Sequence, residues 1–488
     1  MPVLIQKQAF RIFLCLVVAG VICAPGSFVR AQQGQLKAGA AMVDITPPLG
    51  LGIVGNFIIP PATHIHDPLH ARCLVLDDGK SRLVFVIADN CGIARELLDH
   101  SKKLITAETG IPGENVLMAG THTHSAVDAG VDLGLRKAGS NEIEFEDYHL
   151  FLARRMADAV RIAINNLEPA RLGWGSGSVP QHVFNRRWKL KEKIANPFGE
   201  MDQVQFNPGI DNPNKTEPAG GTDPEVTFLS VQSAGGRPIA LLANYSLHYV
   251  GGVPSGHISA DYFALFAEKI KEEIGQQTGD SPPFVAFMTN GTSGDVNNIN
   301  FRGPAAKHPP YEKMNIVADD VAREVLRAYN QVIYKSDISL KAAYANLPVT
   351  VRKPSQKIYE RSIGVRNSPA GTKFGHSLER VFADRAIHIY ENWPAQLEVP
   401  LQVFRIGDLG VAAIPFEVFT EMGVDLRKRA PFAKAFTISF ANGSFGYLPT
   451  PAQHKLGGYE TWLTVTKVEE NASEKITQEI ARLFERVK

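Results

Sequence analysis

Five short apolar runs, each followed by polar side chains, constrain the fold of this 488-residue chain more than any other feature. They alternate with stretches of helical spacing, of which residues 314–328 are the clearest because apolar side chains recur there every three or four positions. Short strands mixed with helices predict an α/β protein in which mixed β-sheets are flanked by helices. Because ligands of such proteins collect beyond the carboxyl ends of strands, we expect the functional site there. The five runs are residues 116–120, 239–243, 284–288, 411–415 and 436–440.

The first run leads directly into Thr121-His122-Thr123-His124-Ser125. Side chains alternate along a strand, so both imidazoles face the same way if the strand continues. Two neutral imidazoles side by side can bind a metal, or one can bind while the other transfers protons. The alternative is a structural role, in which two buried histidines would need separate partners. The pairing favours metal binding or catalysis.

The other runs deliver residue types that suit a metal site at the strand carboxyl ends. His248 follows the second run, Asp295 the third, Glu417 the fourth and Tyr447 the fifth. Histidine together with carboxylate suits zinc with one position left for water, and cysteine ligation is effectively excluded. Taken singly, His248 could be a core histidine, and Glu417 could favour the dipole of a helix that begins there.

A second His-x-His pair, His64 and His66, is a rival candidate. Pro60, Pro61 and Pro68 surround it, and no apolar run leads into it. We therefore predict a loop at the rim of a cleft rather than a pair of ligands.

The first 31 residues have the pattern of an export signal. Lys7 and Arg11 precede the apolar run 12–24, and small or apolar residues lead to Ala31, after which we predict cleavage. We expect a secreted or periplasmic protein whose mature part is residues 32–488. The alternative is an uncleaved anchor, but the run is short for a membrane span, and no later segment is long and apolar enough.

Composition and cysteine positions exclude further classes. The formal net charge of +1, with no long Lys/Arg run, argues against nucleic acid as a partner. A hairpin over residues 74–86 would place Cys73 opposite Val84, far from Cys91, so we expect no disulfide. Short apolar stretches, prolines and charged residues in the segment 335–409 predict an insertion or small subdomain. The segment 208–224 is rich in Pro, Gly, Asn and Asp, which predicts a long loop.

Several sequence blocks resemble those of the neutral/alkaline ceramidases, secreted zinc amidases that cleave N-acyl sphingosines. The resemblance covers roughly residues 38–461, and the order and spacing of the blocks make it fairly specific. The blocks are Gly120-Thr121-His122-Thr123-His124-Ser125, Asn185-Arg186, His248, Gly294-Asp295-Val296-Asn297-Asn298, Phe416-Glu417-Val418-Phe419-Thr420, and Ala441-Asn442 to Tyr447 followed by Tyr459-Glu460.

The resemblance implies a role for each matching residue. Zinc would be held by His122, His248, Glu417 and Tyr447, and a metal-activated water would cleave an N-acyl bond of a lipid or small amine. His124 would lie beside the metal or transfer a proton to the leaving amine. Arg186 and Tyr459 would hold the polar head of the substrate.

Departures from the family pattern bear on the substrate. Residues 126–129 are Ala-Val-Asp-Ala where the family usually has Gly-Pro-Gly-Gly, and the chain stops after the charged helical stretch 473–488, without the family's immunoglobulin-like domain. We therefore expect water-soluble or short-chain N-acyl compounds to be better substrates than long-chain ceramide. The alternatives are an esterase or lactonase with the same chemistry, or a non-catalytic binding protein. The acyl chain, the amine and the oligomeric state stay open.

Overall fold

The computed structural model describes residues 35–131, 143–275 and 282–488. The predicted signal peptide lies outside these ranges. The segment Gly34–Lys488 forms one unit.

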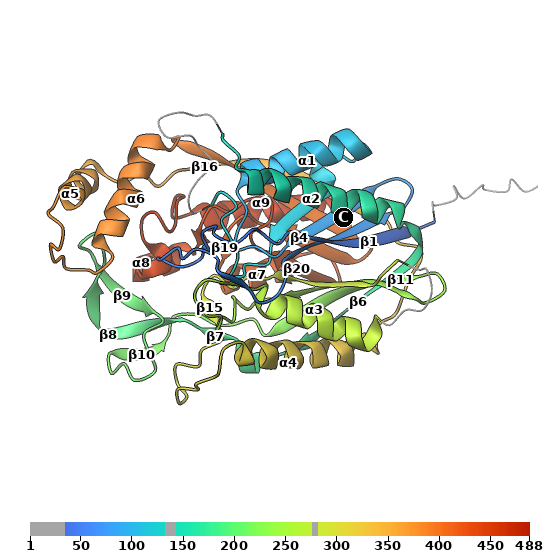
Figure 1. The fold of residues 1–488 in the computed structure, drawn as a ribbon, viewed down its shortest axis with the longest axis horizontal. Coiled ribbons are helices and arrows are strands. Elements are labelled where there is room, and N and C mark those ends of the chain that lie inside the picture. The colour runs from blue at the N-terminus through green and yellow to red at the C-terminus, as the bar shows by residue number, and fades with distance from the viewer. Residues whose placement is uncertain (1–34, 132–142, 276–281) are drawn as a thin grey trace, which may run out of the picture. The chain divides into compact units, whose positions relative to one another are not determined.

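An eight-stranded sheet is the largest element of the fold (Figure 1). Neighbouring strands run antiparallel except for two parallel pairs, β12 with β14 and β4 with β5. The prediction of a mixed sheet is therefore confirmed. In spatial order the strands are β14 (Val285–Asn290), β12 (Pro238–Tyr245), β11 (Glu225–Ser233), β6 (Glu168–Ser178), β1 (Lys37–Asp44), β3 (His70–Asp77), β4 (Arg82–Ala88) and β5 (Val116–Gly120).

A four-stranded sheet packs against one face of the large sheet. It is antiparallel except for the parallel pair of β18 with β20. Its other face is covered by α7 (Thr420–Arg429) and α9 (Ala472–Val487). In spatial order its strands are β16 (Leu340–Thr350), β17 (Gln396–Ile406), β18 (Leu409–Ala413) and β20 (Lys434–Ile438).

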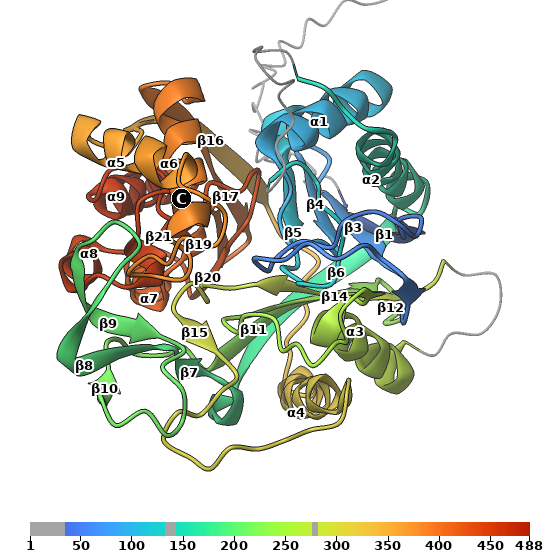
Figure 2. The same ribbon diagram turned by 60° about the vertical axis from the view of Figure 1, so that its left-hand side comes forward.

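Alternation of side chains along the strands explains this layering. On β3, Val75 faces α1 and α2, whereas Leu74 faces the four-stranded sheet. On β11, Phe228 faces α3 and α4, whereas Leu229 faces the four-stranded sheet. The result is four layers, with one helix pair beside each half of the large sheet (Figure 2). These helices are α1 (Arg95–Thr109), α2 (Asp147–Asn165), α3 (Asp261–Ile274) and α4 (Glu312–Tyr329).

Residues 335–409 contribute β16 and β17 to the four-stranded sheet, and a pair of helices connects the two strands. Residues 208–224 contain the strand β10, so the prediction of a continuous loop there is wrong. β10 pairs with β8 in a small separate sheet. The remaining elements are α5 (Gln356–Arg366), α6 (Glu379–Asn392), α8 (Pro451–Leu456), β2 (His64–Ile65), β7 (Phe184–Asn185), β8 (Arg187–Ala195), β9 (Met201–Phe206), β10 (Lys215–Pro218), β13 (His257–Ile258), β15 (Val296–Asn297), β19 (Glu417–Val418), β21 (Tyr447–Leu448), and the 3-10 turns Gly113–Asn115, Pro180–His182 and Tyr459–Thr461.

The predicted hairpin of β3 and β4 is present, but its register differs from the prediction. Cys73 pairs with Val86 rather than with Val84. The loop has four residues, because backbone amides of Lys80 and Ser81 bond to the Asp78 carboxylate, and the longer loop shifts the pairing. Among the described residues, Cys73 and Cys91 form no disulfide.

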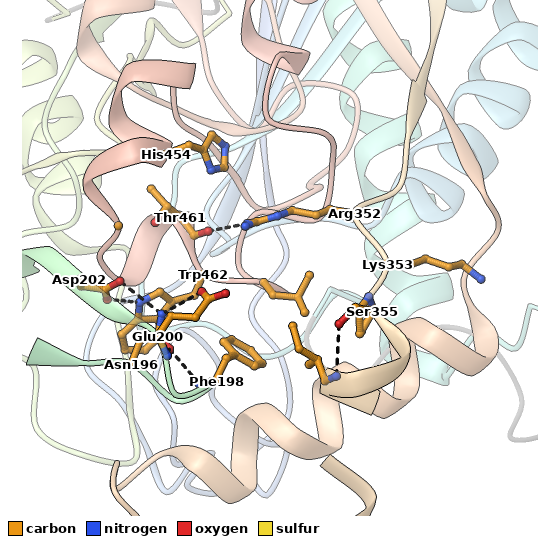
Figure 3. Close-up of a pocket in the computed structure, with 14 residues that line it drawn as sticks. Asn196, Phe198, Glu200, Asp202, Arg352, Lys353, Ser355, His454, Thr461 and Trp462 are labelled. Atoms are coloured by element: carbon orange, nitrogen blue, oxygen red, sulfur yellow. Dashed lines mark hydrogen bonds between the residues drawn. The ribbon is translucent and has the colours of Figure 1, made fainter. Parts of the chain in front are cut away.

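The predicted amphipathic helix forms α4, and its apolar face is buried as expected. Within the described ranges, no helix combines the length and apolar character that crossing a membrane requires. A cavity of about 160 Å³ lies between the turn that joins β8 to β9, the start of α5 and residues 454–463 (Figure 3).

Candidate metal centre

The candidate site forms where the carboxyl ends of β5 and β12 meet, although five strands separate them in the sheet order. The large sheet curls until β14 contacts β5. The segment after β20 then bridges the two edges: the Ser439 amide donates to Asn290 O at 3.0 Å, and the Asn442 amide donates to Met118 O at 2.7 Å. This closure brings together the polar residues that follow separate strands.

His122 does not lie on a continuing strand. β5 ends at Gly120, and His122 has a left-handed backbone with φ of 76°. That conformation costs of order 1–3 kcal/mol for a residue with a side chain and persists only where the surroundings enforce it. The amide of His122 donates to Asn90 O at 2.8 Å, which holds the turn. The premise of strand alternation is therefore wrong, yet the two imidazoles still meet, edge to face with ring centres 4.6 Å apart.

The imidazoles of His122 and His248 face each other through their Nε2 atoms, 3.0 Å apart. Nδ1 of His122 donates to the carbonyl of Cys91 at 2.6 Å, and Nδ1 of His248 donates to the carbonyl of Ser293 at 3.2 Å. A carbonyl only accepts, so each Nδ1 carries the proton of the neutral ring and each Nε2 presents a lone pair. Two lone pairs directed at one point suit a shared cation.

Burial keeps both imidazoles neutral. The pKa of His122 is lowered to about 3, mainly by desolvation, with the bond to Cys91 opposing this change and the nearby charge of Arg186 adding to it. Desolvation likewise lowers the pKa of His248 well below its ordinary value, with Arg186 acting in the same direction. Neutral imidazole is the form that ligates a metal.

Glu417 supplies the carboxylate. Its Oε2 lies 3.7 Å from Nε2 of His122 and 3.8 Å from Nε2 of His248, and ligand atoms of the three residues lie within 4.8 Å of one another. Glu417 begins β19, three residues before α7, so its position is not explained by the dipole of that helix. Histidine nitrogen with carboxylate oxygen fits a zinc ion.

Tyr447 lies beside Glu417 because β19 and β21 pair in parallel with these two residues in register. Its hydroxyl bonds to the Glu417 carboxylate and accepts a hydrogen bond from Nη2 of Arg186 at 2.8 Å. Burial raises the pKa of Tyr447 well above its ordinary value, whereas the guanidinium of Arg186 opposes that rise. All four predicted metal ligands therefore share one corner of the fold.

Arg186 is buried and held in place by a residue that the sequence reasoning did not use. Its Nε bonds to Oε1 of Glu460 at 3.0 Å, while Nη1 of Arg187 bonds to Oε2 at 2.7 Å. Glu460 has no exposed surface. Its position next to Tyr459, within a block that matches the ceramidase pattern, was the available signal.

Tyr459 lies in an aromatic surround at the edge of the site. Its ring stacks on Phe206 at 4.6 Å and meets Phe57 and Tyr447 edge to face, with ring centres 6.0 and 5.8 Å away. Phe57 is 43% exposed, and Ile58, the next residue, is 79% exposed. These apolar side chains beside Tyr459 are a feature that the sequence reasoning missed.

His124 faces the same point as the two other imidazoles, with Nε2 3.1 Å from Nε2 of His122. Its ring stacks on the ring of Tyr249 with centres 3.7 Å apart, and Gly55 lies close to its Cβ, Cγ and Nδ1 atoms. Desolvation lowers the pKa of His124 well below its ordinary value, and the neighbouring His122 and the charge of Arg186 act in the same direction.

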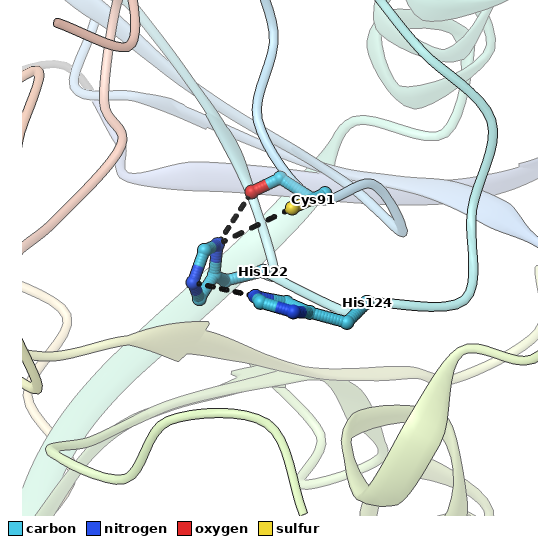
Figure 4. A group of neighbouring side chains, drawn as sticks. All are labelled: Cys91, His122 and His124. Atoms are coloured by element: carbon cyan, nitrogen blue, oxygen red, sulfur yellow. Dashed lines mark hydrogen bonds between the residues drawn. The ribbon is translucent and has the colours of Figure 1, made fainter. Parts of the chain in front are cut away.

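Cys91 lies next to His122, although the sequence analysis excluded cysteine as a ligand (Figure 4). Its Sγ lies 3.8 Å from Nδ1 of His122, and Cys91, His122 and His124 form a second set of neighbouring ligand atoms. Nδ1 of His122 already donates to the Cys91 carbonyl, however. A metal bound by both this nitrogen and the Cys91 thiol would require that hydrogen bond to break. The set with His248 and Glu417 requires no such change.

The rival pair lies apart from these ligands. His64 is in a two-residue strand paired with His257, and the two rings lie 4.5 Å apart. His66 stacks on Tyr311 at 3.7 Å. Both His64 and His66 are exposed. A short strand thus replaces the predicted loop.

The four layers and this cluster define an α/β protein with a candidate metal centre at the carboxyl ends of its strands. The chain belongs to the neutral/alkaline non-lysosomal ceramidase family: the sequence profile of the family's N-terminal region matches residues 37–317, more than half of the chain. The resemblance inferred from the sequence blocks is therefore confirmed.

Individual relatives support this placement. Neutral ceramidase B of Dictyostelium discoideum is 26% identical over 253 residues, which are 50% of this chain and 32% of that protein. Neutral ceramidase of Pseudomonas aeruginosa is 22% identical over 509 residues, covering 92% of this chain and 72% of that protein. The chain thus spans about a third of the first relative. The crystal structure of the Pseudomonas enzyme matches with a TM-score of 0.68 at 18% identity, over 92% of this chain and 74% of that chain, and shows the same fold.

Proposed function

We propose that the protein is a zinc-dependent amide hydrolase that cleaves an N-acyl bond of a lipid or small amine. One observation carries the proposal: two neutral imidazoles, His122 and His248, direct Nε2 lone pairs at one point next to the Glu417 carboxylate. Without a cation, lone pairs 3.0 Å apart would repel each other in a buried place. The donor set therefore fits zinc.

His122, His248 and Glu417, with Tyr447 beside them, would hold the metal. A bound zinc ion polarises a carbonyl oxygen and makes water acidic enough to act as a nucleophile near neutral pH. Because its Nε2 faces the same point, His124 is placed to pass a proton to the leaving amine.

Arg186 and Tyr459 would bind the polar part of the substrate. The guanidinium of Arg186 is fixed by Glu460 and points Nη2 at the Tyr447 hydroxyl, so it places positive charge next to the metal ligands. Positive charge there would stabilise an oxyanion as the amide carbonyl is attacked. Burial lowers the pKa of Arg186, but Tyr447, Glu460 and Glu417 raise it more, so the residue stays cationic.

An apolar acyl group fits the surroundings of Tyr459. Phe57 contacts the Tyr459 ring, and Ile58 beside it is exposed. The named relatives are neutral ceramidases, whose substrates carry such groups. An N-acyl lipid is therefore the substrate class that we propose.

Metal analysis of the purified protein tests this proposal. We expect one zinc per chain, and we expect His122→Ala and His248→Ala to lose metal and amide hydrolysis together. His66→Ala is the matched control, because His66 is exposed and stacks on Tyr311 away from the ligands. Full metal occupancy in both ligand variants would refute the site.

Paired substrates separate the enzyme classes. An N-acyl amide and the ester of the same acyl group should both be offered to the metal-loaded protein. Faster turnover of the amide supports the proposal, whereas turnover of the ester alone would identify an esterase. Metal retention with no turnover of either would favour a binding protein.

We further propose that the protein is exported, on the basis of the leader-like residues 1–31. Sequencing the amino terminus of the protein recovered from its host tests this, and a start at residue 32 is expected.

A further inference from the structure

A cavity separate from the candidate metal centre lies behind Trp462 (Figure 3). The Trp462 ring meets Tyr459 edge to face, with ring centres 5.6 Å apart, and Trp462 also lines the cavity. A single water needs only about 10–15 Å³. At about 160 Å³, the cavity has room for a small organic molecule.

Arg352 provides an incompletely balanced positive charge on one wall. Its Nη1 donates to the Thr461 carbonyl at 2.6 Å, and its nearest carboxylate, that of Glu470, is 3.6 Å away and exposed. Desolvation lowers the pKa of Arg352, and the charges of Glu470 and Glu200 do not fully reverse this. A guanidinium in this position favours an additional anionic partner.

His454 adds a polar atom that lacks a partner. Its Nδ1 is buried and makes no hydrogen bond to any described residue. Buried polar atoms are nearly always satisfied, so an unsatisfied one on a cavity wall indicates a ligand or water. In Figure 3 the imidazole lies on the same side of the cavity as Arg352.

The opposite wall is acidic and aromatic. Asp202 is buried, but it already accepts hydrogen bonds from Trp462 Nε1 at 2.6 Å and from Asn196 at 3.3 Å. Glu200 is exposed, and among the described residues its carboxylate accepts one long hydrogen bond, of 3.4 Å, from Asn196. Glu200 is therefore the carboxylate that remains available to a ligand.

We propose that this cavity binds a small zwitterion, such as an α-amino acid, with its carboxylate on Arg352 and His454 and its ammonium group on Glu200. Opposite charges on the two walls favour a ligand that carries both, because the guanidinium of Arg352 and the exposed carboxylate of Glu200 then each gain a partner. The aromatic ring of Trp462 supplies an apolar wall for the side chain of the ligand.

Binding of three related probes to the full-length, metal-loaded protein tests the proposal. L-alanine carries both charges, propionate only the carboxylate and ethylamine only the ammonium group. Titration calorimetry or ligand-observed NMR should show L-alanine binding at least about tenfold more tightly than either analogue, because each analogue lacks one of the two charged contacts. Equal binding of L-alanine and propionate would overturn the zwitterion assignment, and no binding of any probe would overturn the site.

Three variants locate the binding. Glu200 lies on the surface, so Glu200→Gln should fold normally. It should remove the higher affinity for L-alanine over propionate. Arg352→Gln should weaken the binding of L-alanine and of propionate about tenfold or more. Arg352→Lys keeps the positive charge and should restore part of that affinity. It serves as the test if Arg352→Gln folds poorly. Lys353 also lines the cavity, but its ammonium donates to the Tyr390 carbonyl at 3.2 Å, so Lys353→Gln is the control for the loss of a positive charge alone. An equal loss in Lys353→Gln would show that general charge, not the cavity, binds the probes.

Discussion

Gly55 lies so close to His124 that any side chain at position 55 must displace the imidazole. A Cβ on Gly55 would lie 2.6 Å from Cγ and 2.7 Å from Nδ1 of His124. Carbon atoms in contact are ordinarily about 3.5–4.0 Å apart, so the ring or the loop must move by about 1 Å. Tyr249 stacks on the same ring at 3.7 Å, which restricts where the imidazole can go.

This displacement should lower catalysis without removing the metal. A misplacement of about 1 Å in a reacting group costs on the order of 100-fold in rate. We therefore expect Gly55→Ala to lower kcat about 100-fold on an N-acyl amide while its zinc content stays that of the wild type. The variant also places alanine at φ of 105°, which costs about 1–2 kcal/mol of stability on its own.

Gly50→Ala separates the two effects. Gly50 has nearly the same backbone, with φ of 98°, but a Cβ there meets nothing within 4 Å. Both variants should lose stability in denaturant unfolding, Gly55→Ala more because of the added clash with His124, and only Gly55→Ala should lose kcat. Equal kcat in the two variants would refute a catalytic role for His124, and loss of zinc from Gly55→Ala would show that His124 supports the metal instead.

Three further predictions concern other parts of the molecule. Glu460→Gln leaves the buried guanidinium groups of Arg186 and Arg187 without their shared carboxylate, so unfolding in urea should show a loss of about 3–5 kcal/mol; a loss below 1 kcal/mol would contradict this reasoning. Burial raises the pKa of Asp261 to about 6, above its unfolded value of about 3.9, so its contribution to stability is present below about pH 4 and is lost as the pH rises through 6. Asp261→Asn should remove that part of the pH dependence of unfolding, and an unchanged slope between about pH 4 and 6 would count against it. Ile58→Ser should lower kcat/KM for a long-chain N-acyl substrate but not for the N-acetyl analogue, and equal effects on both would exclude a role in holding the acyl chain.

The acyl-chain comparison also tests the expectation that short-chain substrates are preferred. That expectation assumed that no apolar element outside the signal peptide could meet a lipid. The structure exposes Phe57 and Ile58 beside Tyr459, so the assumption was incomplete. The exposed apolar residues form a run of only three, Phe57 to Ile59, which is too short to show a periodic pattern, so the sequence analysis did not single them out.

Local patterns determined much of the fold. The spacing of apolar residues predicted α4, and the two apolar runs around Asp78-Gly79 predicted the hairpin of β3 and β4. The hairpin register was wrong because side-chain bonds to Asp78 stabilise a four-residue loop, and such bonds depend on detail beyond the apolar pattern.

The sequence by itself also determined which residue types follow the strands: two histidines, a glutamate and a tyrosine that the ceramidase blocks single out. Only the tertiary structure decided that they meet. Five strands lie between β5 and β12 in the sheet, and the ends of these two strands approach because the sheet curls and the segment after β20 bonds to both edges. The left-handed backbone of His122 and the shared carboxylate of Glu460 likewise depend on long-range contacts. Apolar periodicity encodes which face of an element is buried, but the position of one element against another depends on packing between residues far apart in the chain.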